Sequence, residues 1–113
     1  MDFTFPSSFP IRSVLALRVA LQQPEATGLL YRAAWVEGQD ISDPDVVEHL
    51  LDGQGLGGAA LVAGAQDESI KQALRDNTAA AQAAGACGVP TFQVEDTLIW
   101  GQDRLHILAH ALR

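Results

Sequence analysis

The residues best suited to bind a small molecule lie in two short segments near the C-terminus. One is Gly88-Val89-Pro90-Thr91-Phe92, in which a proline enters an apolar and aromatic run, and the other is Gly101-Gln102-Asp103. A bond to proline can be cis at modest cost. A cis Val89–Pro90 bond would leave the Val89 N–H and C=O free to pair with an extended ligand. The second segment opens a helix, whose first N–H groups lack partners and suit an anion. Together the two segments predict a site for a small peptide-like molecule with a carboxylate at one end.

The elements around these segments are a hairpin and a last helix. Residues 91–94 and 97–100 have strand patterns, and Glu95-Asp96 forms the turn between them. Residues 103–113 then form a helix, in which the spacing predicts core positions at Leu105, Ile107, Leu108, Ala111 and Leu112.

The pattern upstream of the hairpin is helical. Pro10 suits the first turn of a helix. The apolar stripe of that helix consists of Ile11, Val14, Leu15, Leu17 and Leu21, with Arg18 on its flank. A second helix is expected from Pro24 to about Glu37, where Gly38 would stop it.

Three further helices are expected before the hairpin. Ser42-Asp43-Pro44-Asp45 combines a capping side chain, a proline and an acid, which predicts a helix start. The glycine-rich segment 52–58 matches no phosphate-binding fingerprint and is predicted to be a turn. Alanine-rich helices are expected over residues 59–65 and 68–84.

Composition limits the classes of partner and of location. The 113 residues allow one small domain, and 14 acidic against 7 basic residues give a net charge of -7. This charge argues against nucleic acid or an anionic membrane surface as a partner. No apolar run approaches the ~20 residues that span a bilayer, and no signal-peptide pattern is present. We therefore expect a cytoplasmic protein.

The chain offers little for redox or metal chemistry. Cys87 is the single cysteine, which excludes an intrachain disulfide and a Cys-x-x-Cys pair. We expect it to be a small buried side chain. His106 and His110 share a helix face, but no third ligand is in an obvious place, so no metal site is predicted.

Two C-terminal motifs resemble the end of 2-hydroxychromene-2-carboxylate isomerases. The first is Gly88-Val89-Pro90-Thr91-Phe92, and the second is the longer stretch Trp100-Gly101-Gln102-Asp103-Arg104-Leu105. These are thioredoxin-fold relatives of kappa-class glutathione transferases and DsbA-type oxidoreductases. The resemblance continues through residues 31–44 and includes Phe9-Pro10 and Ala16-Leu17-Arg18, so it covers nearly the whole chain.

The resemblance implies a mostly α fold with a small β-hairpin, the C-terminal part of a DsbA-like thioredoxin fold. Residues 1–113 would form one partial domain, with a helical insert over residues 1–86 and a cis-proline hairpin and final helix over residues 87–113. The family's opening strand–helix–strand half, which carries the catalytic serine or cysteine, has no counterpart here. We expect either a naturally short relative or a truncated one.

The resemblance also implies glutathione as the cofactor. The Val89 backbone beside Pro90 would pair with the cysteinyl part, Gln102 and Asp103 after Gly101 would hold the γ-glutamyl end, and Trp100 would wall the pocket. The family's reaction is a cis–trans isomerisation of an aromatic pyruvate, in which the glutathione thiol adds reversibly and a double bond rotates. The substrate would be a small aromatic carboxylate.

No catalytic residue is predicted within the chain. Four hydroxyl side chains could replace the family's activating group, but none has a defined motif: Ser7, Ser8, Ser13 and Thr91. The expected function is thus a glutathione-dependent isomerase of this type, incomplete as an active enzyme.

Two other functions remain open, a non-catalytic thioredoxin-like module that binds a ligand or protein, and a dimerising helical domain. An isolated hairpin is marginal in water and its edge exposes unpaired backbone groups, so we expect a homodimer. The site residues also have simpler interpretations. Val89–Pro90 can serve only as a turn, Trp100 can be a core side chain, and Asp103 can be a first-turn acid that stabilises its helix by ~0.3–1 kcal/mol.

Overall fold

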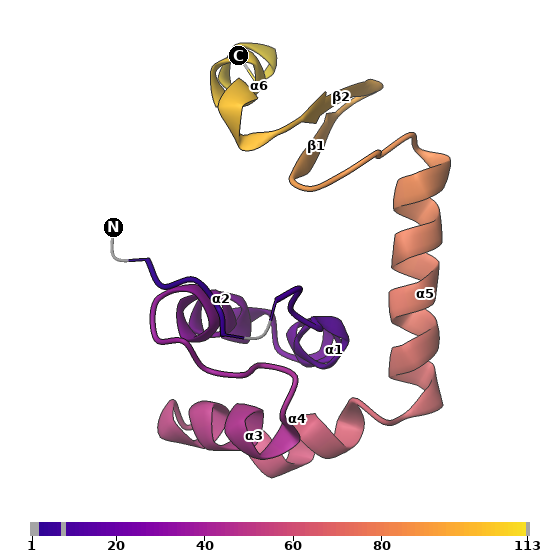
Figure 1. The fold of residues 1–113 in the computed structure, drawn as a ribbon. Coiled ribbons are helices and arrows are strands. Elements are labelled where there is room, and N and C mark those ends of the chain that lie inside the picture. The colour runs from indigo at the N-terminus through magenta and orange to yellow at the C-terminus, as the bar shows by residue number, and fades with distance from the viewer. Residues whose placement is uncertain (1–2, 8, 113) are drawn as a thin grey trace. The chain divides into compact units, whose positions relative to one another are not determined.

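The structure is a computed structural model that describes residues 3–7 and 9–112, with the side chain of Gln102 outside the description. These residues form six α-helices, two short 3-10 helices and one two-stranded antiparallel sheet (Figure 1). The predicted fold class, mostly α with a small hairpin, is confirmed. The chain divides into two compact units, Met1–Leu74 and Arg75–Arg113.

The first unit begins with an extended arm that pairs with the end of a helix. The Thr4 N–H donates to the Trp35 carbonyl at 2.7 Å, and Thr4 Oγ1 donates to the Val36 carbonyl at 3.0 Å. The Phe3 ring stacks on the Trp35 indole with centroids 5.7 Å apart. The arm therefore satisfies carbonyl groups that the end of that helix would otherwise leave unpaired.

Three helical segments follow the arm: α1 (Val14–Gln22), the 3-10 helix η1 (Pro24–Ala26) and α2 (Thr27–Trp35). The prediction that Pro10 lies in the first turn of a helix is wrong. Pro10 belongs to the arm, and its peptide bond with Phe9 is cis. The helix begins after Ser13, a residue type favoured at the N-cap, whose carbonyl accepts from the Leu17 N–H at 2.9 Å.

The start of α3 (Pro44–Gly53) is the predicted one. Asp43 occupies the N-cap, and its Oδ1 accepts from the Asp45 N–H at 2.9 Å. The glycine-rich segment after α3 is the predicted turn, with φ of +70° at Gly55 and +69° at Gly57. Asp52 Oδ1 accepts from the Gly58 N–H at 2.7 Å and so holds the start of the next helix.

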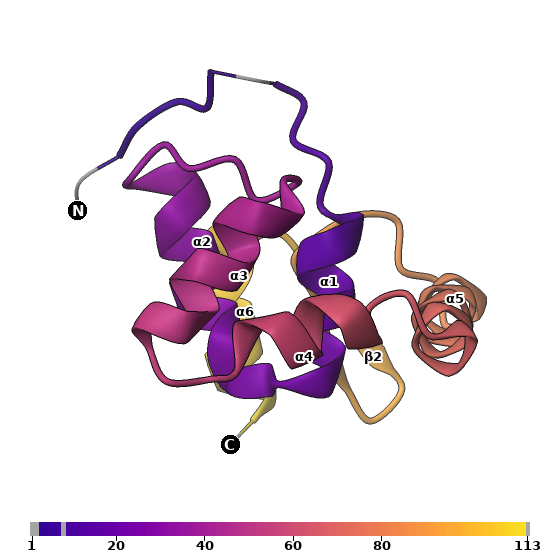
Figure 2. The same ribbon diagram turned by 90° about the horizontal axis from the view of Figure 1, so that it is seen from below.

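Helix α4 (Gly58–Gly64) packs closely against α3, and the two lie side by side in Figure 2. Gly58 is buried, and a Cβ there would lie 2.9 Å from the Cα and carbonyl carbon of Glu48. Only glycine permits this approach. Gln22 ties α1 to α4, since its Nε2 donates to the Leu61 carbonyl at 2.9 Å.

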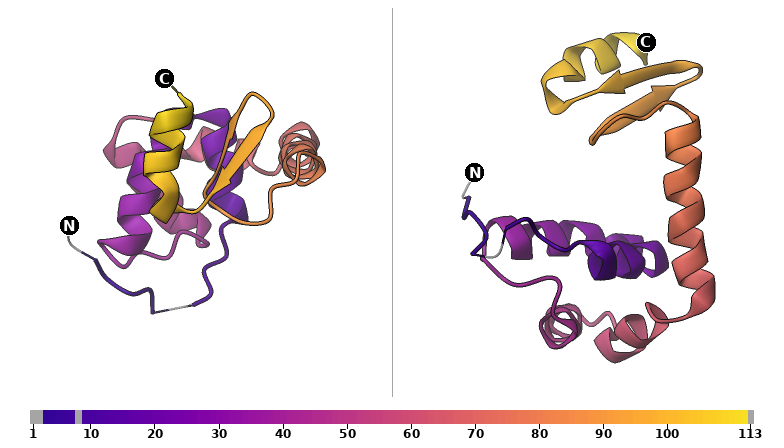
Figure 3. Two further views of the ribbon diagram at one scale, coloured as in Figure 1. Left: turned by 90° about the horizontal axis from the view of Figure 1, so that it is seen from above. Right: turned by 45° about the vertical axis from the view of Figure 1, so that its right-hand side comes forward.

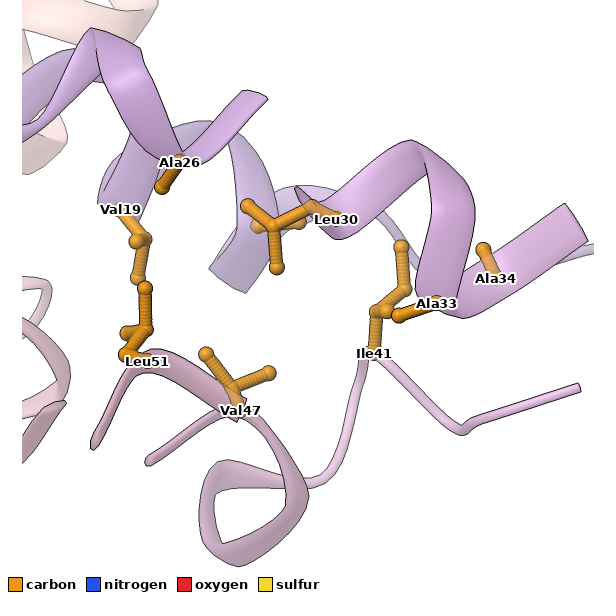
Figure 4. Close-up of a cluster of buried hydrophobic side chains, with 9 residues drawn as sticks. Val19, Ala26, Leu30, Ala33, Ala34, Ile41, Val47 and Leu51 are labelled. Atoms are coloured by element: carbon orange, nitrogen blue, oxygen red, sulfur yellow. The ribbon is translucent and has the colours of Figure 1, made fainter. Parts of the chain in front are cut away.

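The core of the first unit is a cluster of small and medium apolar side chains (Figure 4). Val19, Val47 and Leu51 are its largest fully buried members. The other members are Ala16, Ala26, Leu30, Ala33, Ala34 and Ile41.

The predicted apolar stripe of α1 is only partly correct. Val14 and Leu17 are 49% and 47% exposed, while Ala16 and Val19 are buried. Because five of the nine core residues are alanine or valine of α1, η1 and α2, these segments meet on small side chains. The larger side chains of the stripe lie at the edge of the contact, where Ile11 and Leu15 are half-buried.

The second unit contains the predicted hairpin. Helix α5 (Glu68–Ala83) leads into it and has no buried residue in its described length. Strands β1 (Thr91–Val94) and β2 (Thr97–Trp100) pair antiparallel, with Thr91 opposite Trp100 and Val94 opposite Thr97. Both strands have the predicted bounds. A 3-10 helix, η2 (Gln102–Arg104), and α6 (Leu105–Ala111) follow, and α6 lies beside the hairpin (Figure 3).

The core positions predicted for the last helix are wrong. Leu105, Ile107 and Leu112 are 51%, 44% and 67% exposed, and Leu108 and Ala111 are only half-buried. The reason is the size of the covering layer, because two four-residue strands cover one side of a helix only in part. Within the described part of this unit, Ile99 is the one buried apolar residue, at 4% exposure. None of the helices in the described ranges combines the length and apolarity needed to cross a bilayer.

Candidate functional site

The Val89–Pro90 peptide bond is cis, a state that the sequence left open. Val89 is 91% exposed. Among the described residues, none makes a hydrogen bond to the Val89 N–H or C=O. This donor and acceptor lie immediately before β1, so a short stretch of backbone is open to an extended ligand.

The hairpin register brings the two predicted segments together. Thr91 lies opposite Trp100, and the Pro90 carbonyl accepts from the Gly101 N–H at 2.9 Å. Pro90 and Gly101, which flank the two strands, are therefore neighbours at the open end of the hairpin. Gly101 leads directly into η2, and the open Val89 backbone immediately precedes Pro90.

Trp100 lies against the segment that precedes Val89. A Cβ at Gly88 would lie 2.6 Å from the Trp100 Nε1, so the indole rests on the bare Cα of this glycine. The Trp100 side chain is 48% exposed, which makes it a surface side chain and not a buried core residue. Thr91, its partner across the hairpin, donates a hydrogen bond from Oγ1 to the Gly88 carbonyl. Sequence reasoning assigned no part to Gly88.

Gly101 and Asp103 form the entry to the last helices. Gly101 has φ of +104°, a conformation that favours glycine, and a Cβ there would lie 2.5 Å from Asp103 Oδ1. Asp103 is exposed. The backbone of Gln102 begins η2, while the predicted role of its side chain lies outside the described residues.

Three other predictions concern residues with possible chemistry. The expectation that Cys87 is buried is wrong: its side chain is exposed, because the loop between α5 and β1 has no covering element in the described structure. Ser13 occupies the N-cap position of α1, and Ser8 lies outside the described residues. In the described ranges no three His, Cys, Asp or Glu side chains gather as metal ligands, and His106 and His110 are exposed on α6.

A cavity of about 280 Å³ in the first unit was not expected from the sequence. It lies between the N-terminal arm and the loop after α2, and Arg12, Asp40 and Ser42 are among its lining residues. The Ser42 hydroxyl donates to Asp40 Oδ1 at 2.6 Å, and the Ser42 N–H donates to the same oxygen at 3.0 Å. These bonds hold the pKa of Asp40 below its ordinary value of 3.8, and the bond from the Ser42 hydroxyl has the larger effect. The Asp-x-Ser spacing is a turn signal that could have indicated this loop.

Comparison with known proteins gives one family and one fold. The sequence matches the DSBA-like thioredoxin domain over residues 2–113. No curated protein matches it. The structure is similar to that of 2-hydroxychromene-2-carboxylate isomerase (HCCA isomerase), with a TM-score of 0.84 and 20% sequence identity. The match covers 99% of this chain and 57% of that one, and at this identity the likeness shows the fold alone.

Proposed function

Since the chain belongs to the DSBA-like thioredoxin domain family, we propose that it holds glutathione for a cis–trans isomerase of the HCCA isomerase type. The observation that carries the proposal is the open backbone of Val89, directly before Pro90, whose carbonyl accepts from the Gly101 N–H at 2.9 Å. The Val89 backbone offers one donor and one acceptor to an extended peptide, and the Asp103 carboxylate lies against the Cα of Gly101.

The residues present fit a γ-linked tripeptide. The Val89 N–H and C=O pair with the cysteinyl part of glutathione, as one strand pairs with another. The exposed carboxylate of Asp103 binds the α-amino group of the γ-glutamyl end. The first N–H groups of η2, at residues 102 and 103, face its α-carboxylate.

The role of this chain is to bind and orient glutathione. Glutathione would supply the thiol that adds reversibly to a conjugated small aromatic carboxylate. Trp100, 48% exposed beside Gly88, gives the site an aromatic wall that suits an aromatic substrate. The chain spans little more than half the length of the HCCA isomerase structure, and no residue of it is assigned the activation of the thiol.

Calorimetric titration with glutathione tests this proposal. We expect micromolar to low millimolar binding that Asp103→Ala abolishes. Asp96→Ala, which removes an exposed acid from the hairpin turn, is the matched control and should leave binding unchanged. An absence of heat at high protein and ligand concentrations, or equal loss in both variants, would contradict the proposal. Binding without isomerase activity would favour a non-catalytic ligand-binding module.

A second candidate function is a dimerising module. The observation that favours it is the exposure of Leu105, Ile107 and Leu112 along the last helix, since a second copy could cover these side chains. Sedimentation velocity over a range of concentrations tests it. A dimer that Ile107→Glu dissociates would support this function, and a monomer at all concentrations would exclude it.

A further inference from the structure

The loop before β1 is held from two sides, and both contacts come from one cross-strand pair. Thr91 and Trp100 lie opposite each other at the open end of the hairpin. Thr91 Oγ1 donates to the Gly88 carbonyl. The Trp100 indole covers the Cα of the same residue, since a Cβ at Gly88 would lie 2.6 Å from Nε1, 3.0 Å from Cε2 and 3.2 Å from Cζ2.

Gly88 directly precedes Val89, whose backbone groups are open. Val89 has no hydrogen bond of its own within the described residues, so its position depends on its neighbours. Pro90 fixes one side through the hydrogen bond from the Gly101 N–H at 2.9 Å. Gly88 fixes the other side through Thr91 and Trp100.

We infer that Trp100 and Thr91 are positioning residues that act through Gly88 to hold the Val89 backbone in place for its ligand. A loop that is already ordered loses less conformational entropy when a ligand pairs with it. The size of residue 88 then matters because of the indole. Gly88 does not have a positive φ, so alanine suits its backbone, and Trp100 is the obstacle to a methyl group.

The first test measures the order of Val89 without ligand, by 15N relaxation of the full chain. A rigid backbone amide has an order parameter of about 0.85, and a flexible one falls below about 0.6. We expect a rigid Val89 in the unmodified chain and a flexible one in Gly88→Ala, Trp100→Ala and Thr91→Val. Thr91→Ser keeps the hydroxyl and should keep Val89 rigid. Gly28→Ala is the matched control, because a Cβ at Gly28 meets nothing within 4 Å.

The second test measures glutathione affinity, and this part of the inference rests on the proposed function. Gly88→Ala and Trp100→Ala should each weaken glutathione binding about tenfold. A loss of this size lies within the range of interaction energies between residues in contact. Both changes break the same contact, so the double variant should bind no more weakly than Trp100→Ala alone. Additive losses would overturn the inference.

The two measurements separate the two possible failures. If the unmodified chain does not bind glutathione, the proposed function fails, and the order of Val89 still decides the inference. If Val89 is flexible in the unmodified chain, or stays rigid in Gly88→Ala, Trp100→Ala and Thr91→Val, the inference is wrong whatever binds there. Thr91→Val changes a single half-exposed hydroxyl to a methyl, so it keeps the test open if a Trp100 variant fails to fold.

Discussion

The carboxylate of Asp103 lies back over the Cα of Gly101, so close that a Cβ at Gly101 would be 2.5 Å from Oδ1. The φ of Gly101 is +104°, which an L side chain adopts only with strain. The same residue donates its N–H to the Pro90 carbonyl. Gly101 thus links the proline segment, the hairpin end and the Asp103 carboxylate.

Gly101→Ala should therefore disturb both stability and binding. The backbone strain is expected to lower the free energy of unfolding by roughly 1–3 kcal/mol, and displacement of Asp103 should weaken glutathione binding. Denaturation followed by Trp100 fluorescence, in a Trp35→Phe background, reports on the second unit. Gly53→Ala is the control, because a Cβ at Gly53 meets nothing within 4 Å. Unchanged unfolding in Gly101→Ala would show that residue 101 does not need its left-handed conformation.

The core of the first unit predicts a contrast between two leucines. Leu51 is fully buried in the helical cluster, while Leu17 is 47% exposed on α1. Leu51→Ala should lower the free energy of unfolding by about 2–5 kcal/mol, since it removes buried methyl groups and leaves a cavity. Leu17→Ala should change it by no more than ~0.5 kcal/mol. Urea denaturation followed by far-UV circular dichroism measures both, and equal effects would contradict the placement of the core.

The N-cap of α3 predicts a smaller and more specific effect. Asp43 Oδ1 accepts from the Asp45 N–H at 2.9 Å, so Asp43→Ala leaves a helix donor unpaired. We expect a loss of about 0.5–2 kcal/mol in the free energy of unfolding. Asp43→Asn keeps an accepting oxygen and should retain most of the stability. A loss in the asparagine variant as large as in the alanine variant would assign the effect to charge and not to capping.

The Asp40–Ser42 pair predicts a pH dependence. Hydrogen bonds from Ser42 hold the pKa of Asp40 below 3.8. Because the folded pKa is the lower one, ionised Asp40 contributes stability above pH 3.8, and this contribution is lost as the pH falls through the folded pKa. Ser42→Ala removes the larger cause and should move the pKa up towards 3.8. An NMR titration of the Asp40 carboxyl carbon measures this, and an unchanged pKa would show that the hydroxyl bond does not form in solution.

Local chemistry is what the sequence predicted best. The bounds of β1 and β2, the Asp43 cap and the glycine-rich turn follow from residues that act on their immediate neighbours. The approach of Pro90 to Gly101 follows from two motifs joined by one short hairpin, whereas the sequence left the cis or trans state of the Val89–Pro90 bond open.

The burial of helix faces could not be predicted in the same way. Periodicity identifies which residues share a face, but the partner helix decides which of them are covered. In α1 the contact runs along Ala16 and Val19, while Val14 and Leu17 remain exposed. The contact of Trp100 with Gly88 depends on the path of the loop before β1, which no spacing in the sequence records.

The second unit has, among its described residues, a single buried apolar side chain, that of Ile99. So small an interior contributes little free energy of folding by itself. Any molecule that binds only the ordered form adds its binding free energy to that of folding. The melting temperature of this unit should therefore rise as added ligand fills its binding site. Thermal denaturation is thus a practical way to screen for compounds that the unit binds.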